Sequence, residues 1–137
     1  MDYTIIARTP DIETFAHLRA LAGLSPRSRE GMEKGLPNTL YAVLIVLGDH
    51  PIGMGRIIGD GGTAYQIVDI AVDPAHQGKG LGKAIMAALA DWLEREAPED
   101  AYVSLIADGD ARHLYGKFGF EPVMPASIGM ARVMSKP

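Results

Sequence analysis

A loop with glycine at every second position could bind an anion. Gly78, Gly80 and Gly82 lie within residues 77–83, directly before a segment with helical apolar periodicity. Glycine lets the backbone approach a ligand closely and adopt positive φ angles, so several N–H groups can point at one spot. The start of a helix adds a partial positive charge, and two lysines of the loop add full charges. These features predict a binding site for a pyrophosphate.

Two common nucleotide-binding patterns do not fit this loop. A Walker A loop needs a glycine, four intervening residues, a Gly-Lys pair and then a serine or threonine. With Gly82 and Lys83 as that pair, Gln77 stands where the first glycine is needed and Ala84 stands where the serine or threonine is needed. The dinucleotide fingerprint needs glycine at its first, third and sixth positions. The sixth position is Lys83 if the motif starts at Gly78, and Ile85 if it starts at Gly80. Neither pattern is present.

A third pattern, Gln/Arg-x-x-Gly-x-Gly/Ala, fits at Gln77, Gly80 and Gly82. A strand and a turn, residues 68–74, precede it, and a long amphipathic segment follows it. Residues 108–120, DGDARHLYGKFGF, match Asn-x-x-Ala-x-x-x-Tyr-x-Lys-x-Gly-Phe except at the first position. With these motifs the sequence resembles the GCN5-related N-acetyltransferases (GNAT superfamily), and the resemblance covers essentially the whole chain.

The resemblance implies that the ligand is acetyl-CoA. The backbone of the strand before the loop pairs with the pantetheine arm in that family, and one of its N–H groups serves as a donor to the thioester carbonyl. The loop holds the pyrophosphate. The cofactor-binding residues implied for this chain are Ile70, Ala71, Val72, Gln77, Gly78, Lys79, Gly80, Leu81, Gly82, Lys83, Asp108 and Tyr115.

Tyr115 occupies the position of the family's tyrosine, which the resemblance makes a proton donor to the leaving CoA thiolate. A tyrosine hydroxyl with a pKa near about 10 is protonated at neutral pH and can donate. Asp108 stands where the family has asparagine, and a carboxylate accepts hydrogen bonds but cannot donate them. Asp108 is therefore either an altered cofactor contact or a helix cap, a role for which Asp110 competes.

The attacking amine needs a base, because a free alkylamine is mostly protonated at neutral pH. Asp69 is the candidate base or water-holding residue, and the competing interpretation is a structural carboxylate. Regular strand alternation puts Asp69 on one face with Tyr65, which could line the acceptor pocket. It puts Val68 on the other face, beneath the long helix. A bulge near Ala71, as the resemblance implies, would alter this pattern.

The order of elements indicates a mixed sheet with helices packed on it. Antiparallel strands come first, and a crossover through the long helix leads to a further strand. The resemblance specifies an α/β (α+β) fold with a mixed, mostly antiparallel sheet of six or seven strands, about four helices and a splayed CoA slot. We expect strands at residues 3–8, 40–47, 51–59, 63–72, 101–107 and 128–134, and helices at 11–21, near 25–35, after the loop to 96 and at 110–117.

Composition narrows the class of protein. With 137 residues, 47% apolar and 22% charged, the chain is expected to be a single GNAT acetyltransferase domain over residues 1–137. It has no cysteine, and its histidines show no ligand spacing, so we expect no metal site. A net charge of −4 predicts no nucleic-acid partner. No apolar run of membrane-spanning length and no signal sequence are found, which predicts a cytoplasmic protein without a membrane partner.

We therefore expect an enzyme, an acyltransferase that moves an acetyl group from acetyl-CoA directly to a primary amine of a small molecule. The alternatives are a non-catalytic acyl-CoA-binding or sensing domain and transfer of a longer acyl group. The acceptor is expected near residues 24–30, Tyr41, Met54 and Arg56. Arginines there suit an acceptor with a carboxylate or phosphate, whereas the net acidity favours a cationic amine. The family also allows a homodimer through the last strand or a sheet edge.

Overall fold

The computed structural model describes residues 2–135. It contains two units, one that ends at Leu105 and one that starts at Ile106, and each is considered by itself. In the described part of the chain, no helix has both the length and the apolar character needed to cross a membrane. The sheet and the three longer helices belong to the first unit.

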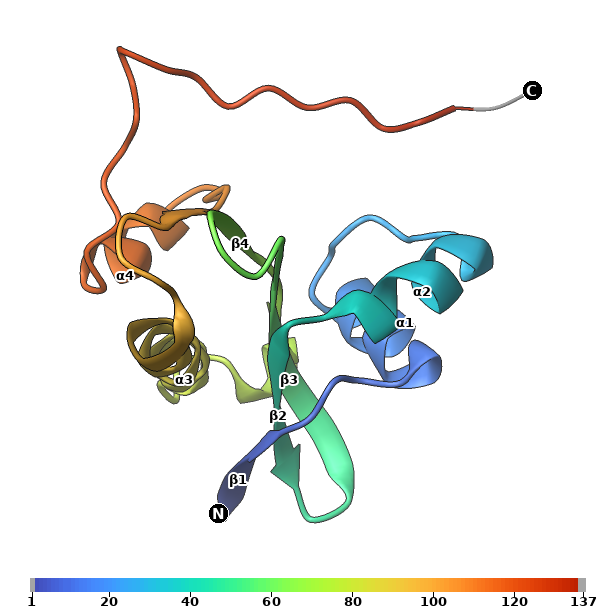
Figure 1. Ribbon diagram of the computed structural model, residues 1–137. Coiled ribbons are helices and arrows are strands. Elements are labelled where there is room, and N and C mark those ends of the chain that lie inside the picture. Colours follow the sequence, from blue (N-terminus) through green and yellow to red (C-terminus); the bar gives the residue numbers. More distant parts are fainter. Residues whose placement is uncertain (1, 136–137) are drawn as a thin grey trace. The chain divides into compact units, whose positions relative to one another are not determined.

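Five strands form a single sheet in the order β1-β2-β3-β4-β5 (Figure 1). The first four are antiparallel neighbours, and β5 pairs with β4 in parallel. The fold class and the mostly antiparallel sheet agree with expectation, although the sheet has fewer strands than the six or seven predicted. The strands are β1 (Tyr3–Ala7), β2 (Tyr41–Leu47), β3 (His50–Gly59), β4 (Ala64–Val72) and β5 (Tyr102–Ser104).

Helices cover both faces of the sheet. Helices α1 (Ile12–Leu21) and α2 (Arg29–Gly35) lie on one face and α3 (Leu81–Glu96) lies on the other (Figure 1). Asp11 and Ser28 cap α1 and α2, because their side chains accept hydrogen bonds from the N–H groups of Thr14 and Gly31. Short 3-10 turns occupy Leu36–Asn38 and Pro74–His76, and α4 (Ala111–Gly116) belongs to the second unit.

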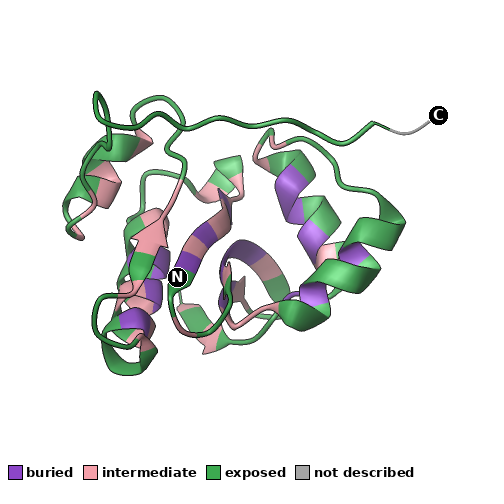
Figure 2. Ribbon diagram, turned by 45° about the horizontal axis from the view of Figure 1, so that its top comes forward, coloured by how far each residue is buried: buried purple, intermediate pink, exposed green. Residues whose placement is uncertain are grey.

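Buried residues occur on the strands and on the helices that cover both faces of the sheet (Figure 2). Between α3 and the sheet, the fully buried side chains include Ile85, Met86 and Leu89 of the helix. Under α1 and α2 a second cluster joins Phe15, Leu18, Met32 and Leu36 to Leu44, Met54 and Ala71 of the strands. Because each residue of this kind contributes roughly 1.5–3 kcal/mol when fully buried, the two layers together fix the helices on the sheet.

Two glycines in β3 allow α3 to approach the sheet closely. A Cβ atom on Gly53 would lie 3.3 Å from Ile85 Cδ1, and one on Gly55 would lie 2.5 Å from Ile85 Cγ2 and 3.1 Å from Leu89 Cδ1. The sequence predicts a bulge or a close approach at these glycines. The structure shows that the approaching group is the apolar face of α3.

A bulge in β4 corrects the predicted strand faces. Arg56 pairs with Val68 and Met54 pairs with Ala71, so Asp69 and Ile70 together oppose Gly55. Tyr65 was expected on the acceptor side, but it is buried and its ring packs against Trp92 of α3. Val68 was expected beneath α3, but it lies across from Arg56, whose side chain faces α1. The extra residue in the bulge reverses which face of the sheet the alternate side chains occupy. The side chains before the bulge therefore lie on the opposite face from the predicted one, whereas those after it lie on the predicted face.

The predicted strands near the C-terminus are also corrected. Strand β5 has three residues, not the seven of 101–107. Residues 128–134 form no strand, and Ile128, Met130 and Val133 are exposed. Their β-branched and apolar residues favour a strand, but a strand also needs a partner for its backbone hydrogen bonds, and no described strand pairs with this segment.

Replacing Gly55 with alanine should destabilise the protein, because the new methyl group would overlap Ile85 in the layer under α3. Overpacking of this kind costs roughly 1–3 kcal/mol. Gly35→Ala is the control, since Gly35 has helical angles and free space around its Cα. Urea unfolding should show a lower free energy for Gly55→Ala and an unchanged or slightly higher one for Gly35→Ala. Equal stabilities would contradict the packing described here.

Candidate functional site

The loop before α3 has the backbone geometry expected for anion binding. Gly78 and Gly80 both have φ of +78° and are exposed. Gly80 is the N-cap of α3, no side chain caps this end, and the first turn carries no acidic residue. The first N–H groups of a helix have no acceptor inside the helix, so those of α3 are available to a ligand. Lys79 and Lys83 are exposed beside them.

Tyr3 of β1 contacts this loop through Lys79 and the turn before it through His76. Lys79 Nζ donates to the Tyr3 hydroxyl at 3.0 Å and lies 5.7 Å from the centre of its ring. The same hydroxyl is hydrogen-bonded to His76 Nδ1 at 3.1 Å, and the two rings meet edge to face. Sequence reasoning missed Tyr3, because a contact across 76 residues leaves no local pattern.

The end of β4 that leads to the loop has no strand partner on one side within the described residues. β4 pairs with β5 only from Ala64 to Gln66, and no described strand pairs with Ile70, Ala71 or Val72 on that side. The backbone of these residues can therefore pair with an extended ligand as a strand would. The expected splay between two strands stays a prediction, because β5 ends at Ser104. β4 continues through Asp73 and the turn Pro74–His76 into the loop. The ligand-binding roles of these residues and of the loop stay predictions.

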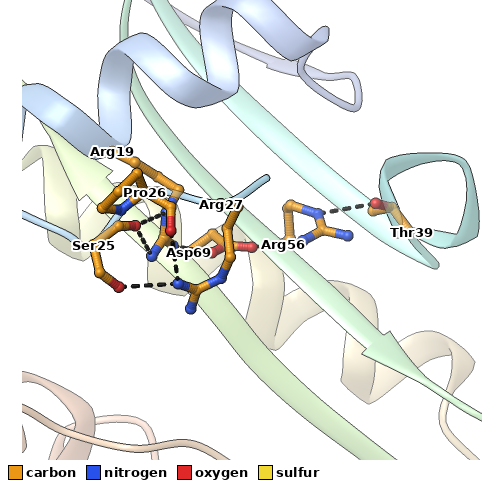
Figure 3. A network of polar contacts seen from close by, with 7 residues as sticks. All are labelled: Arg19, Ser25, Pro26, Arg27, Thr39, Arg56 and Asp69. Carbon is orange, nitrogen blue, oxygen red and sulfur yellow. Dashed lines mark hydrogen bonds and ion pairs between the residues drawn. The ribbon is translucent and has the colours of Figure 1, made fainter. Parts of the chain in front are cut away.

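Asp69 lies in the bulge of β4 between two arginines (Figure 3). Its φ is +59°, which is uncommon for a residue with a side chain. Arg19 Nη1 donates to its Oδ1 and Arg56 Nη1 to its Oδ2, each at 2.5 Å. All three side chains are at least nine-tenths buried. The bulge therefore aims a carboxylate at the α1 side of the sheet.

The two arginines have further partners that fix their positions. Arg19 Nε and Nη2 donate to the Ser25 carbonyl at 2.9 and 2.7 Å. Arg56 Nε donates to Thr39 Oγ1 at 2.9 Å, and its Nη2 donates to the Gly35 carbonyl at 3.4 Å. Each guanidinium also lies 5.6 Å from the centre of the Phe15 ring, in cation–π geometry.

Burial lowers the pKa of the Arg19 guanidinium, and the Asp69 carboxylate opposes this shift. The charges of Arg27 and Arg56 lower the pKa of Arg19 further. Arg19 and Arg27 both contact Ser25, and Arg19 and Arg56 both contact Asp69, so the three arginines lie in one region. Sequence reasoning assigned no role to Arg19, but a signal exists. Arg19 follows Phe15 by four positions and so lies on the apolar face of α1, where a charged residue needs a buried partner.

This geometry bears on the predicted role of Asp69 as a base. Both of its oxygens already accept hydrogen bonds from guanidinium groups, so neither oxygen is free to face an incoming amine. The arrangement suits a carboxylate that positions Arg19 and Arg56. The catalytic role stays a prediction that the contacts do not favour. The neighbouring Asp73 accepts a hydrogen bond from the N–H of Ala75 and so shapes the turn before the loop.

Tyr115 and Asp108 belong to the second unit. Tyr115 lies near the end of α4 and is partly buried, and burial raises the pKa of its hydroxyl, with a further upward contribution from the Asp108 carboxylate. Asp110 occupies the N-cap position of α4, but its side chain makes no capping hydrogen bond. The Asp108 carbonyl accepts a hydrogen bond from the N–H of Ala111. The roles of Tyr115 and Asp108 at the cofactor stay predictions. Within residues 2–135, no group of three His, Asp or Glu side chains could hold a metal ion.

Known proteins are similar to this chain in sequence and in structure. An uncharacterized N-acetyltransferase ycf52-like from Prochlorococcus marinus is 31% identical over 125 residues, which cover 86% of this chain and 68% of that protein. GCN5-related N-acetyltransferase 2, chloroplastic, from Arabidopsis thaliana is 39% identical over 70 residues, 51% of this chain but 26% of the plant protein. This chain thus matches only about a quarter of the length of that relative.

A solved structure is similar over nearly the full chain. It is a protein of unknown function, a probable acetyltransferase, from meticillin-resistant Staphylococcus aureus, with 47% identity and a TM-score of 0.92. The match covers 97% of this chain and 100% of the other. The model of the acetyltransferase (GNAT) family matches residues 11–120, which include the loop, β4 and α4. The chain therefore belongs to the acetyltransferase (GNAT) family.

Proposed function

We propose that this protein is an N-acetyltransferase that moves the acetyl group of acetyl-CoA to a primary amine of a small molecule. The observation that carries this proposal is the exposed loop before α3, in which Gly78 and Gly80 have positive φ angles. This loop follows β4, and the last residues of β4 have no described strand partner on one side. Family membership supports the reaction class. Acetyl-CoA offers a pyrophosphate for the loop and an extended pantetheine arm for the strand, so its chemistry fits both features.

The residues divide the work between binding and chemistry. The loop with Lys79 and Lys83 binds the pyrophosphate, and the backbone at Ile70–Val72 binds the arm. In the transfer, the amine nitrogen forms a bond to the acetyl carbon and the carbon–sulfur bond breaks. The proton that the amine loses passes to water, from which Tyr115 regains the proton that it gives to the sulfur. Tyr115 donates a proton to the leaving sulfur. Its raised pKa keeps the hydroxyl protonated at neutral pH, which is the form that can donate.

A second candidate is a non-catalytic domain that binds acyl-CoA. The engagement of both Asp69 oxygens by arginines favours it, because this candidate base is not free. The substitution of aspartate for the family's asparagine at Asp108 favours it as well. An assay with acetyl-CoA and a panel of small amines, followed by thiol release, separates the two functions. CoA binding without acetylation of any amine would support the sensor and exclude the enzyme.

Tyr115→Phe should lower kcat by about a hundredfold or more and leave KM for acetyl-CoA nearly unchanged, because it removes a proton donor and keeps the ring. The direction of the pKa shift has a further consequence. A tyrosine with a pKa above its usual value of about 10 donates throughout the neutral range, so ionisation of Tyr115 should cause no loss of rate below about pH 9.

Tyr102→Phe is the matched control, since Tyr102 lies on β5 with 60% of its surface exposed. Steady-state kinetics of both variants and of the wild type test the assignment. If Tyr115→Phe retains the activity of Tyr102→Phe, Tyr115 is not the donor.

Gly80→Val should weaken CoA binding by about tenfold. A β-branched residue at φ of +78° is strained by roughly 1–3 kcal/mol, and relief of that strain would turn the N–H groups of the loop away from the ligand. Gly23→Val is the control, because Gly23 also has φ of +78° and free space around its Cα but follows α1. Both variants should lose similar stability in thermal unfolding. In calorimetric titration with CoA, equal affinities of the two variants would argue against the loop as the binding site.

A further inference from the structure

Positive charge exceeds negative charge around Asp69. Arg19, Arg56 and Arg27 surround this region, whereas Asp69 is the one carboxylate that forms an ion pair with any of them among the described residues. Arg27 Nη1 donates to Ser25 Oγ at 2.9 Å and to the Pro26 carbonyl at 3.3 Å, and both acceptors are neutral (Figure 3). Three guanidinium groups and one carboxylate leave an excess of two positive charges.

A cavity of about 170 Å³ opens at this point between α1, α2 and the sheet. Arg27, Arg56 and Asp69 contribute polar atoms to its wall, and Phe15, Met32 and Leu36 contribute apolar ones. Of the five N–H donors of a guanidinium group, Arg56 uses three on Asp69, Thr39 and Gly35. Donors therefore remain on a side chain that lines the cavity and cannot move, because its other bonds hold it.

We propose that this cavity binds the oxyanion of a small acceptor, a carboxylate or a phosphate, through Arg27 and Arg56. The description of this ligand as the acceptor rests on the proposed acetyl transfer, whereas the anion site does not. Guanidinium groups match the geometry of carboxylate and phosphate, and the apolar wall suits a short aliphatic stem. Asp69 acts as a positioning residue, because it holds Arg56 and Arg19 in place. The acceptor class is then an amine that carries a carboxylate or phosphate group.

Arg27 is the side chain that tests this proposal most cleanly. It is exposed and makes no ion pair in the described structure, so its loss should not unfold the protein, unlike loss of the buried Arg56. Arg29→Gln is the matched control for Arg27→Gln. Arg29 lies two positions further, is also exposed, and faces Glu13 and Glu33 instead of the cavity.

The first experiment is a nitrogen-15 NMR titration with inorganic phosphate and, separately, acetate, against sodium chloride at the same ionic strength. No acetyl-CoA is present. The amide signals of Gly31 and Gly35 report the cavity, and those of Gly78 and Gly80 report the loop. We expect saturable shifts at the cavity glycines in wild type and Arg29→Gln. The apparent Kd should be about tenfold higher in Arg27→Gln, as expected for loss of a charge-assisted hydrogen bond.

The second experiment compares acceptors in matched pairs with acetyl-CoA. An amino carboxylate is compared with its amide, and an aminoalkyl phosphate with the corresponding amino alcohol. The anionic member of at least one pair should have the higher kcat/KM. Arg27→Gln should remove most of that preference by raising the KM for the anionic acceptor. The pair that shows the preference identifies the oxyanion as carboxylate or phosphate.

The outcomes separate the two proposals. Absence of shifts at Gly31 and Gly35, or shifts of equal affinity in Arg27→Gln, would overturn the anion site. A preference for the neutral member of both pairs would overturn the acceptor class. Arg27-dependent binding without acetylation of any amine would leave the anion site standing and remove the proposed acetyl transfer.

Discussion

The ion triad of Asp69, Arg19 and Arg56 is the interaction on which the packing of α1 against the sheet depends. It joins three elements, because Arg19 comes from α1, Arg56 from β3 and Asp69 from β4. Desolvation of buried ions costs several kcal/mol for each, so the triad adds little net stability, but loss of one partner costs about 3–5 kcal/mol. Its structural effect is to fix the position of α1 and of the chain at Ser25 and Gly35 relative to the strand.

The bulge in β4 makes this arrangement possible and also lies next to the part of β4 that has no strand partner on one side in the described chain. One extra residue opposite Gly55 puts Asp69 at φ of +59° and aims it at α1. Directly after it, Ile70–Val72 run along the side of β4 that β5 has left unpaired. The side chain that holds the two arginines and the backbone that lacks a described strand partner therefore lie within four residues of each other. The two candidate binding regions therefore share one irregularity, and a change in the bulge would alter both.

Local signals in the sequence were sufficient for much of the fold. The glycines of β3 and the loop before α3 each leave a short pattern with a physical cause, and the structure contains the corresponding features. The bulge leaves no such pattern. The faces of Tyr65 and Val68 were consequently assigned wrongly, although the residues were placed in the correct strand.

The remaining differences also concern contacts between distant residues. The charged Arg19 on the apolar face of α1 indicates that a buried partner exists, but not that the partner is Asp69, 50 residues away. Tyr3 reaches the loop only because β1 joins the edge of the sheet next to β2. The predicted strand at residues 128–134 was wrong, because propensity alone cannot supply the neighbouring strand that the backbone needs.

The distribution of charge gives the two regions a common physical basis. The chain carries 17 acidic and 13 basic residues, so its overall field repels anions. Five of the basic residues, Arg19, Arg27, Arg56, Lys79 and Lys83, nevertheless belong to the loop or to the cavity region. At physiological ionic strength the Debye length is about 8 Å, so a ligand at either region is governed by these nearby donors more than by the net charge. The net acidity of the chain is for this reason no argument for a cationic acceptor, and local charge is the better guide to its chemistry.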